Sequence, residues 1–124
     1  MNATQKDDCI FCKIVSREFP SRDNPTPLVY EDEHIVAFHD INPQAPVHLL
    51  VIPRKHIAKI GEISEEDSAI LLQLVQAVNH MAKETGMFED GYRIVINSGD
   101  NGGQTVYHLH AHVLGGRFMR WPPG

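Results

Sequence analysis

The sequence predicts a single α+β domain built on an antiparallel sheet, and two observations carry this prediction. Five segments have the composition of strands, while one long segment has helical spacing and one short segment is a second candidate helix. The 124 residues also contain no repeat, low-complexity tract or linker that would divide them. We expect one domain over 1–124, with a flexible N-terminus at 1–8 and a C-terminal tail at 117–124. The expected strands are 28–30, 34–39, 47–52, 92–97 and 107–114.

The first half of the chain supplies a short helix, a loop and the central strand. Residues 10–18 place their apolar side chains on one side of a helix. Residues 19–28 form a loop, because their three prolines interrupt any helix or strand. The apolar run V-H-L-L-V-I at 47–52 lies between two prolines and is typical of a buried central strand.

The second half contains one clear amphipathic helix, to which we assign a scaffolding role. Ser64 is a good N-cap, and three acidic residues follow it, where the positive end of the helix dipole favours them. Gly86 supplies the C-terminal stop. Apolar residues recur at the three-four spacing of a helix face at Leu71, Leu74, Val75, Val78, Met81 and Ala82.

Composition excludes several classes of function. Sixteen acidic against eleven basic residues give a net charge of −5, so no basic surface for nucleic acid is expected, although a mononucleotide needs only local donors. No apolar run approaches the roughly 18 residues of a membrane span, and the N-terminus lacks a signal-peptide pattern. We therefore expect a cytoplasmic protein. In that reducing compartment Cys9 and Cys12 are better explained as metal ligands, redox thiols or packing residues than as a structural disulfide.

Three of the eight histidines fall within five positions, at His108, His110 and His112. In a strand they share one face, whereas the apolar residues between them face the core. His48, in the central apolar strand, could reach the same surface. Such a row offers a neutral nucleophile or base and donors for phosphate oxygens. The competing interpretation is a zinc site made by two of these rings and a ligand from a neighbouring strand.

A glycine-rich loop, S-G-D-N-G-G-Q-T, leads directly into the histidine row. Its amides at Gly102, Gly103, Gln104 and Thr105 could form an anion-binding nest, although the same glycines also suit a plain hairpin turn. A nest beside neutral imidazoles favours phosphoryl chemistry. The other histidines receive no functional role, with His34, His56 and His80 assigned to the surface and His39 to structure.

Residues 102–116, G-G-Q-T-V-Y-H-L-H-A-H-V-L-G-G, resemble the signature of the histidine triad (HIT) family. Residues 38–53 look like the family's other signature segment, and the closing R-W-P-P-G is similar to the Hint branch of nucleoside phosphoramidases. The resemblance extends from about Ile10 to the C-terminus. It implies the HIT fold, a five-stranded antiparallel sheet with one long and one short helix. It also implies a homodimer that joins two sheets into one of ten strands, with Trp121 near the partner subunit.

The resemblance assigns chemistry to the triad without any required cofactor. His110 would attack the α-phosphorus of an adenosine 5′-phosphoramidate, expel the amine and become adenylylated, after which water would release AMP. The backbone carbonyl of His108 would orient His110, and His112 would bond to phosphate oxygens. Thr105 lies where the family usually has serine, and its hydroxyl can donate towards the leaving group or the phosphate.

The resemblance also implies how a purine nucleotide is bound. Asp40 would accept the ribose hydroxyls, Asn97 would anchor the ribose-phosphate end, and the amides from Gly103 to Thr105 would hold the phosphate. For Ile14 and Leu50 an ordinary core position explains the residue nearly as well. The residues matching the family's purine pocket are Ile10, Phe11, Ile14, Phe38, Ile41 and Leu50.

Two features depart from the Hint pattern. The loop at 19–28 is longer than expected, which bears on substrate access. The C-I-F-C segment matches many bacterial relatives, in which it implies a structural zinc held here by Cys9, Cys12, His48 and His108. A metal there would leave His110 available as nucleophile.

Other activities stay open beside the phosphoramidase. Aminoacyl adenylates are further candidate substrates. A dinucleoside polyphosphate hydrolase or nucleotidyl transferase is the second hypothesis, although transferase relatives replace the third histidine with glutamine and the R-W-P-P-G end disfavours the polyphosphate branch. The third is a nucleotide-binding module whose hydrolysis is incidental.

Overall fold

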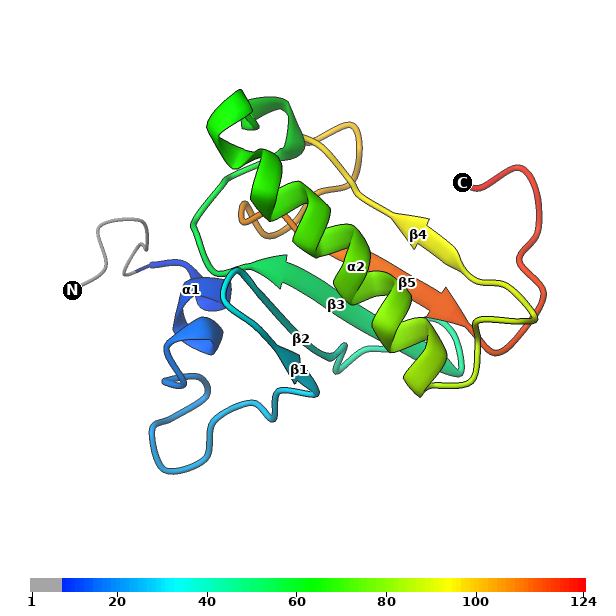
Figure 1. Ribbon diagram of the computed structural model, residues 1–124, viewed down its shortest axis with the longest axis horizontal. Helices are drawn as coiled ribbons and strands as arrows, with labels where there is room; N and C mark the ends of the chain where they lie inside the picture. Colours follow the sequence, from blue (N-terminus) through cyan, green and yellow to red (C-terminus); the bar gives the residue numbers. More distant parts are fainter. Residues whose placement is uncertain (1–7) are drawn as a thin grey trace.

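The computed structural model describes residues 8–124 and contains one antiparallel sheet with a helix on each side (Figure 1). The five strands are ordered β1-β2-β3-β5-β4, and every neighbouring pair is antiparallel. This arrangement confirms the predicted fold class. Apart from Asp8, the predicted flexible N-terminus lies outside the described residues. The elements are α1 (Ile10–Val15), β1 (Tyr30–Glu31), β2 (Ile35–His39), β3 (Val47–Pro53), α2 (Ser68–Glu84), β4 (Arg93–Val95) and β5 (Ala111–Gly115).

The central strand β3 is buried on both faces, as its continuous apolar run predicted. Leu49 and Val51 face a core shared with α2, whereas Leu50 and Ile52 face a second core shared with α1. The alternation arises because successive side chains of a strand point to opposite faces. The sheet therefore separates two apolar clusters, and His108 and His110 pack against Phe11 on the α1 side.

Helix α2 lies across one face of the sheet (Figure 1). Two short 3₁₀ turns, Ile60–Glu62 and Glu65–Asp67, precede it. Ser64 and Asp67 form a reciprocal capping box at the second of these turns. Ser64, predicted as the N-cap of the long helix, therefore caps this turn, and α2 itself begins at Ser68 with Asp67 as its N-cap. Val75, placed on the buried stripe by its spacing, is instead 55% exposed. No helix within residues 8–124 is long and apolar enough to cross a membrane.

Helix α1 is shorter than predicted and packs on the opposite face of the sheet. It ends at Val15, because Arg17 adopts a positive φ of 61° that no α-helix can continue through. Its N-cap is Cys9, whose sulfur accepts the backbone N–H of Cys12 at 3.3 Å. Both thiols lie close to the ring of His108, which precedes β5.

The last strand begins later than the alternating pattern predicted. A strand was expected from residue 107, but β5 starts at Ala111, which pairs with Val51. The residues before it are held by other bonds, including Leu109 N–H donating to the Ile57 carbonyl at 2.6 Å. The first two histidines of the row therefore lie before the strand, although Leu109 still points into the α2-side core as expected.

Candidate active site

His110 is held so that one ring nitrogen faces away from the backbone with its lone pair available. Its Nδ1–H donates to the carbonyl of His108 at 2.7 Å, which leaves Nε2 as the acceptor atom of a neutral ring. The Phe11 ring of α1 packs edge-on against it, with centroids 5.1 Å apart. Burial lowers the pKa of His110 below the usual imidazole value, so the neutral, nucleophilic form is favoured.

His112 is oriented by His48 from the neighbouring strand. The backbone N–H of Gln44 donates to His48 Nδ1 at 3.0 Å, so the ring proton of neutral His48 must sit on Nε2. That atom lies 2.9 Å from His112 Nδ1, which makes His112 Nδ1 an acceptor and His112 Nε2–H a donor. Burial, and next the neighbouring His110 and His48 rings, lower the pKa of His112 to about 4.

We call Gln44 N–H, His48 and His112 the imidazole relay. Asp40 lies beside it, with Oδ2 3.4 Å from His48 Nε2 and Oδ1 accepting the Asn42 N–H at 2.8 Å. Asp40, His48 and His112 place ligand atoms close enough together to hold a metal. The relay argues against one, because a metal on His48 Nε2 would have to displace the proton that the Gln44 bond fixes there.

The glycine-rich loop is only partly the anion nest that the sequence suggested. The Gly103 N–H donates to the Asp100 carbonyl at 3.0 Å, and the Gln104 N–H donates to the Gly99 carbonyl at 3.1 Å. Two of the predicted phosphate donors are therefore used inside the loop. The turn itself requires glycine, since Gly103 has φ +82°.

The side chain of Gln104 stabilises this loop through hydrogen bonds to the backbone. It is buried, accepts the Gly99 N–H at 2.9 Å and donates to the Ala58 carbonyl at 2.7 Å. Thr105, the next residue, is exposed. Gln104 was predicted to contact the phosphate, and these side-chain hydrogen bonds were not predicted. A motif of backbone donors does not indicate where a side chain points.

The residues proposed for the purine pocket divide into a buried wall and an exposed rim. Phe11 and Phe38 contact edge-to-face at 5.6 Å, and Ile14 and Leu50 are buried in the same cluster. Ile10 is partly exposed and Ile41 is 95% exposed. Asn97 is half-buried two residues beyond β4. The burial of Ile14 and Leu50 fits the ordinary core position that was the alternative to a role in the purine pocket.

A second group, which we call the thiol cluster, consists of Cys9, Cys12, His56 and His108. Cys9 Sγ lies 3.3 Å and Cys12 Sγ 3.5 Å from His108 Nδ1, while Cys12 Sγ lies 3.3 Å from His56 Nδ1. All four ligand atoms lie within 4.8 Å of one another. His108 Nε2–H donates to the Pro53 carbonyl at 2.8 Å, so the Nδ1 lone pair faces the sulfurs. Burial lowers the pKa of His108 to about 4, against the opposing effect of that bond.

The predicted metal set needs one correction, because His56 takes the place given to His48. Strand β3 runs antiparallel to β5, so His48 pairs with Leu114 near the far end of β5. Residues that follow β3 instead lie beside those that precede β5, which brings His56 to His108. Assigning His56 to the surface was therefore wrong. The register that decides this is a property of the folded sheet, so the spacing of the motifs could not reveal it.

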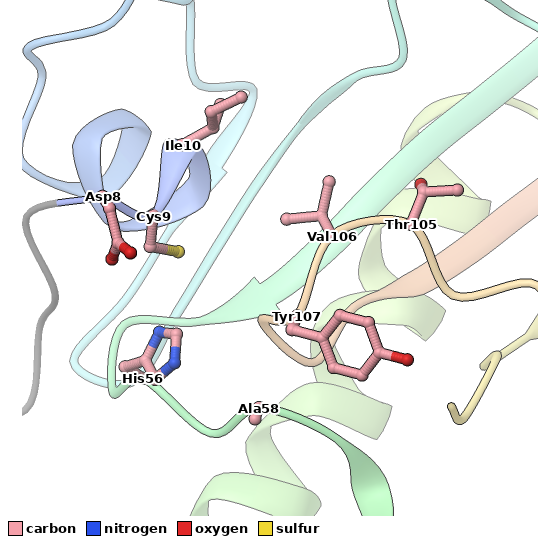
Figure 2. A pocket seen from close by; sticks show the side chains of 8 residues that line it. All are labelled: Asp8, Cys9, Ile10, His56, Ala58, Thr105, Val106 and Tyr107. Atoms are coloured by element: carbon pink, nitrogen blue, oxygen red, sulfur yellow. The ribbon is translucent and has the colours of Figure 1, made fainter. Parts of the chain in front are cut away.

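A surface cavity of about 400 Å³ opens between the thiol cluster and the glycine-rich loop. Figure 2 shows Cys9 and the His56 ring on one side and the segment from Thr105 to Tyr107 on the other. The thiol cluster and the proposed phosphate contact at Thr105 thus border the same cavity.

Comparisons with known proteins agree with this geometry. The sequence matches the HIT domain family over residues 21–119. The chain belongs to the HIT family. An uncharacterized HIT-like protein of Synechococcus elongatus is 52% identical over 118 residues, which cover 95% of this chain and 98% of that protein.

Solved structures of other HIT proteins share the fold. A HIT family hydrolase from Legionella pneumophila has a TM-score of 0.86 and 48% identity, over 94% of this chain and all of that one. The histidine triad nucleotide-binding protein of Candida albicans has a TM-score of 0.73 and 30% identity, over 86% of this chain and 73% of that one.

In this HIT protein the ring protons of the triad have two arrangements, because His108 and His112 carry the proton on Nε2 and His110 carries it on Nδ1. His108 offers a lone pair to the thiols, His110 offers one to the site, and His112 offers an N–H. A lone pair beside an N–H donor can attack an electrophilic centre and bind the charge that develops on it.

Proposed function

We propose that this HIT protein is a hydrolase that cleaves the P–N bond of purine nucleoside 5′-phosphoramidates through a nucleotidyl-histidine intermediate. The observation that carries the proposal is the His110 Nδ1–H bond to the His108 carbonyl, which leaves Nε2 as a nucleophile. His112 Nε2–H beside it supplies a donor to the phosphoryl oxygens. The relatives titled hydrolase and nucleotide-binding protein support the reaction class.

The reaction has two displacements at phosphorus. His110 Nε2 attacks, the P–N bond breaks with its electron pair on nitrogen, and the departing amine takes a proton from solvent. Water then attacks the phosphorus of the intermediate, releases AMP and restores the lone pair of His110. His112 and Thr105 bind the phosphoryl oxygens in both steps, and Asp40 holds the ribose hydroxyls.

Replacing His110 with alanine tests the proposal. Loss of the nucleophile should lower kcat for an adenosine phosphoramidate by at least about 10⁴-fold, while AMP binding is kept. His80→Ala, an exposed change on α2, is the matched control. Turnover retained without His110 would refute the mechanism. Diadenosine polyphosphates and acyl-adenylates assayed beside the phosphoramidate would identify the competing hydrolase activities, and tight binding without turnover of any of them would identify a binding module.

We also propose that the thiol cluster holds one structural zinc ion. Two sulfurs and two imidazole nitrogens are a donor set typical of closed zinc sites, and the His108 bond to the Pro53 carbonyl is the outer-shell contact that such a ligand requires. Zinc bound there would supply a structural cross-link between α1 and the segments carrying His56 and His108. A cytoplasmic location, still a prediction, would keep both thiols reduced.

The exposed edge of the sheet supports the homodimer. Strand β4 ends the sheet order, and Ile94 on it is 49% exposed. Leu72 and Val75 on α2 are exposed as well. An open apolar edge of this kind is a site for strand pairing with a second copy. Trp121 is 80% exposed, with the Arg93 guanidinium 5.8 Å from the centroid of its ring, and the exposed part of the ring would be available to the partner subunit.

Ile94→Lys should convert the dimer to a monomer, because a buried charge at the strand pair has no partner. Sedimentation at micromolar concentration measures this directly. Glu33→Lys, an exposed charge change in the chain between β1 and β2, is the control. A wild-type protein that sediments only at 14.0 kDa would rule out the dimer.

A further inference from the structure

We propose that the thiol cluster positions His110, so that loss of metal from Cys9, Cys12, His56 and His108 lowers turnover while nucleotide binding stays nearly unchanged. The inference rests on the proposed function. It concerns how the nucleophile is held, and it begins from the place of His110 in the chain.

His110 lies outside the ladder of strand β5. The first residue of β5 is Ala111, so the nucleophile is held at a point where the sheet's regular hydrogen bonds have not yet begun. A residue at such a position depends on the particular bonds of its own segment.

Those bonds attach the segment before β5 to the chain that follows β3. His108 Nε2–H donates to the Pro53 carbonyl at 2.8 Å, and Leu109 N–H donates to the Ile57 carbonyl at 2.6 Å. The Gln104 side chain donates to the Ala58 carbonyl at 2.7 Å. All three acceptors lie within residues 53–58, the segment that contains His56.

The thiol cluster joins these two segments to α1. Cys12 Sγ lies within 3.5 Å of both His56 Nδ1 and His108 Nδ1, so one sulfur contacts a ring from each. The same helix carries Phe11, whose ring packs against His108 and His110 with centroids 6.0 Å and 5.1 Å away. A metal bound by the cluster would therefore fix the helix, both segments and the ring that packs on the nucleophile.

His108 connects the thiol cluster directly to the ring of His110. Its side chain belongs to the cluster, and its own carbonyl accepts the Nδ1–H of His110. A shift of His108 moves the acceptor that orients the nucleophile. A displacement of about 1 Å at a reacting group costs up to about 10²-fold in rate.

Two of the groups proposed to bind nucleotide, Asp40 and His112, are held by bonds outside the thiol cluster. His48 and His112 lie within β3 and β5, and Gln44 N–H fixes the His48 ring. Asp40 follows β2, and its backbone N–H donates to the His48 carbonyl at 3.0 Å. Metal loss should therefore act on kcat much more than on AMP affinity.

The test uses the zinc-loaded full chain, the same protein after chelation, and the chelated protein reloaded with zinc. We expect chelation to lower kcat about 10- to 100-fold, to change the Kd for AMP less than about threefold, and to be reversed by reloading. The ring ¹⁵N signals of His110 should change from one Nδ1–H tautomer to a mixture, and amide exchange in residues 104–110 should accelerate.

Two variants separate positioning from general stability. His56→Cys keeps a four-ligand zinc set and should keep zinc, kcat and the His110 signals. Val15→Ala removes buried volume from α1 without removing a ligand of the cluster, so it should lower the melting temperature and leave the His110 tautomer unchanged. Equal loss of kcat in Val15→Ala and in the chelated protein would show that the cluster acts only through stability.

The inference fails if the metal-free protein keeps the His110 ring signals, the amide protection and kcat of the loaded protein. If chelation unfolds the chain, the His56→Cys variant decides instead. The inference then fails if this variant binds zinc but still has a lowered kcat and has lost the single Nδ1–H tautomer of His110. The ring signals need no substrate. Absence of phosphoramidate turnover in every form would therefore refute the proposed function alone.

Discussion

The imidazole relay and the thiol cluster are both built from histidines on neighbouring segments, yet their ring protons point in opposite directions. In the relay, Gln44 N–H donates to His48 Nδ1, so an N–H of His48 faces the next ring. In the thiol cluster, His108 donates to the Pro53 carbonyl, so a lone pair of His108 faces the sulfurs. One backbone group, a donor in the first case and an acceptor in the second, decides which cluster can take a metal.

The difference shows that proximity of ligand-type residues is a weak criterion for a metal site. The thiol cluster brings four such residues together, and His48 and His112 of the relay form a group of three with Asp40. Only the thiol cluster has its imidazole lone pair and its soft sulfur ligands directed at a common point. The relay instead fixes the ring protons of His48 and His112.

The largest expected effect is on metal content. His56→Ala should reduce zinc from about one ion per chain to a small fraction, because a closed site loses one of four ligands. His48→Ala, the matched removal of an imidazole from the relay, should leave zinc at about one per chain. Elemental analysis of both purified variants measures this. Zinc lost from His48→Ala but kept in His56→Ala would reverse the comparison.

The fold and the common orientation of the three triad histidines could be predicted from the sequence, but the ligands of the metal site could not. Period-two alternation placed His108, His110 and His112 correctly relative to the core, because Leu109 is buried against α2. The assignment of His48 to zinc failed because motif spacing carries no register. The β3–β5 pairing, which decides whether His48 or His56 meets His108, depends on contacts between segments far apart in the chain.

The onset of β5 and the form of the glycine-rich loop were also beyond the sequence. The side chains of His108 and Gln104 hydrogen-bond to the carbonyls of Pro53 and Ala58, and the segment before Ala111 does not join the β3–β5 pairing. Tertiary contacts of this kind override strand propensity. The same contacts use the Gly103 and Gln104 amides within the loop rather than for an anion.

The next expected effect is on turnover through the relay. His48→Leu removes the N–H that fixes the His112 tautomer, and we expect kcat/KM to fall about 10- to 100-fold. His48→Gln should recover much of this, because its amide can accept the Gln44 N–H and donate to His112 Nδ1. Zinc content should stay unchanged in both variants. Equal activity of His48→Leu and wild type would show that His112 needs no partner.

The smallest expected effect is on pH dependence, and it distinguishes the nucleophile from an ordinary exposed imidazole. Attack requires neutral His110, and burial lowers its pKa below the 6.5 of an unperturbed imidazole. Protonation therefore begins at a lower pH than for a free ring, and the acid limb of kcat/KM, which reports the free enzyme, should lie below pH 6.5. Burial lowers the pKa of His112 to about 4, so His112 is neutral at pH 6.5.

Phe11→Ala sharpens this prediction. Removing the ring that packs on His110 exposes the imidazole to water, so the desolvation that lowers its pKa is reduced and the acid limb should move up towards 6.5. Phe88→Ala, which removes an exposed aromatic beyond the C-terminal end of α2, should leave the limb in place. The measurement is kcat/KM for the phosphoramidate across about pH 4 to 8. A wild-type limb at or above 6.5 would mean that burial does not set the protonation of the nucleophile.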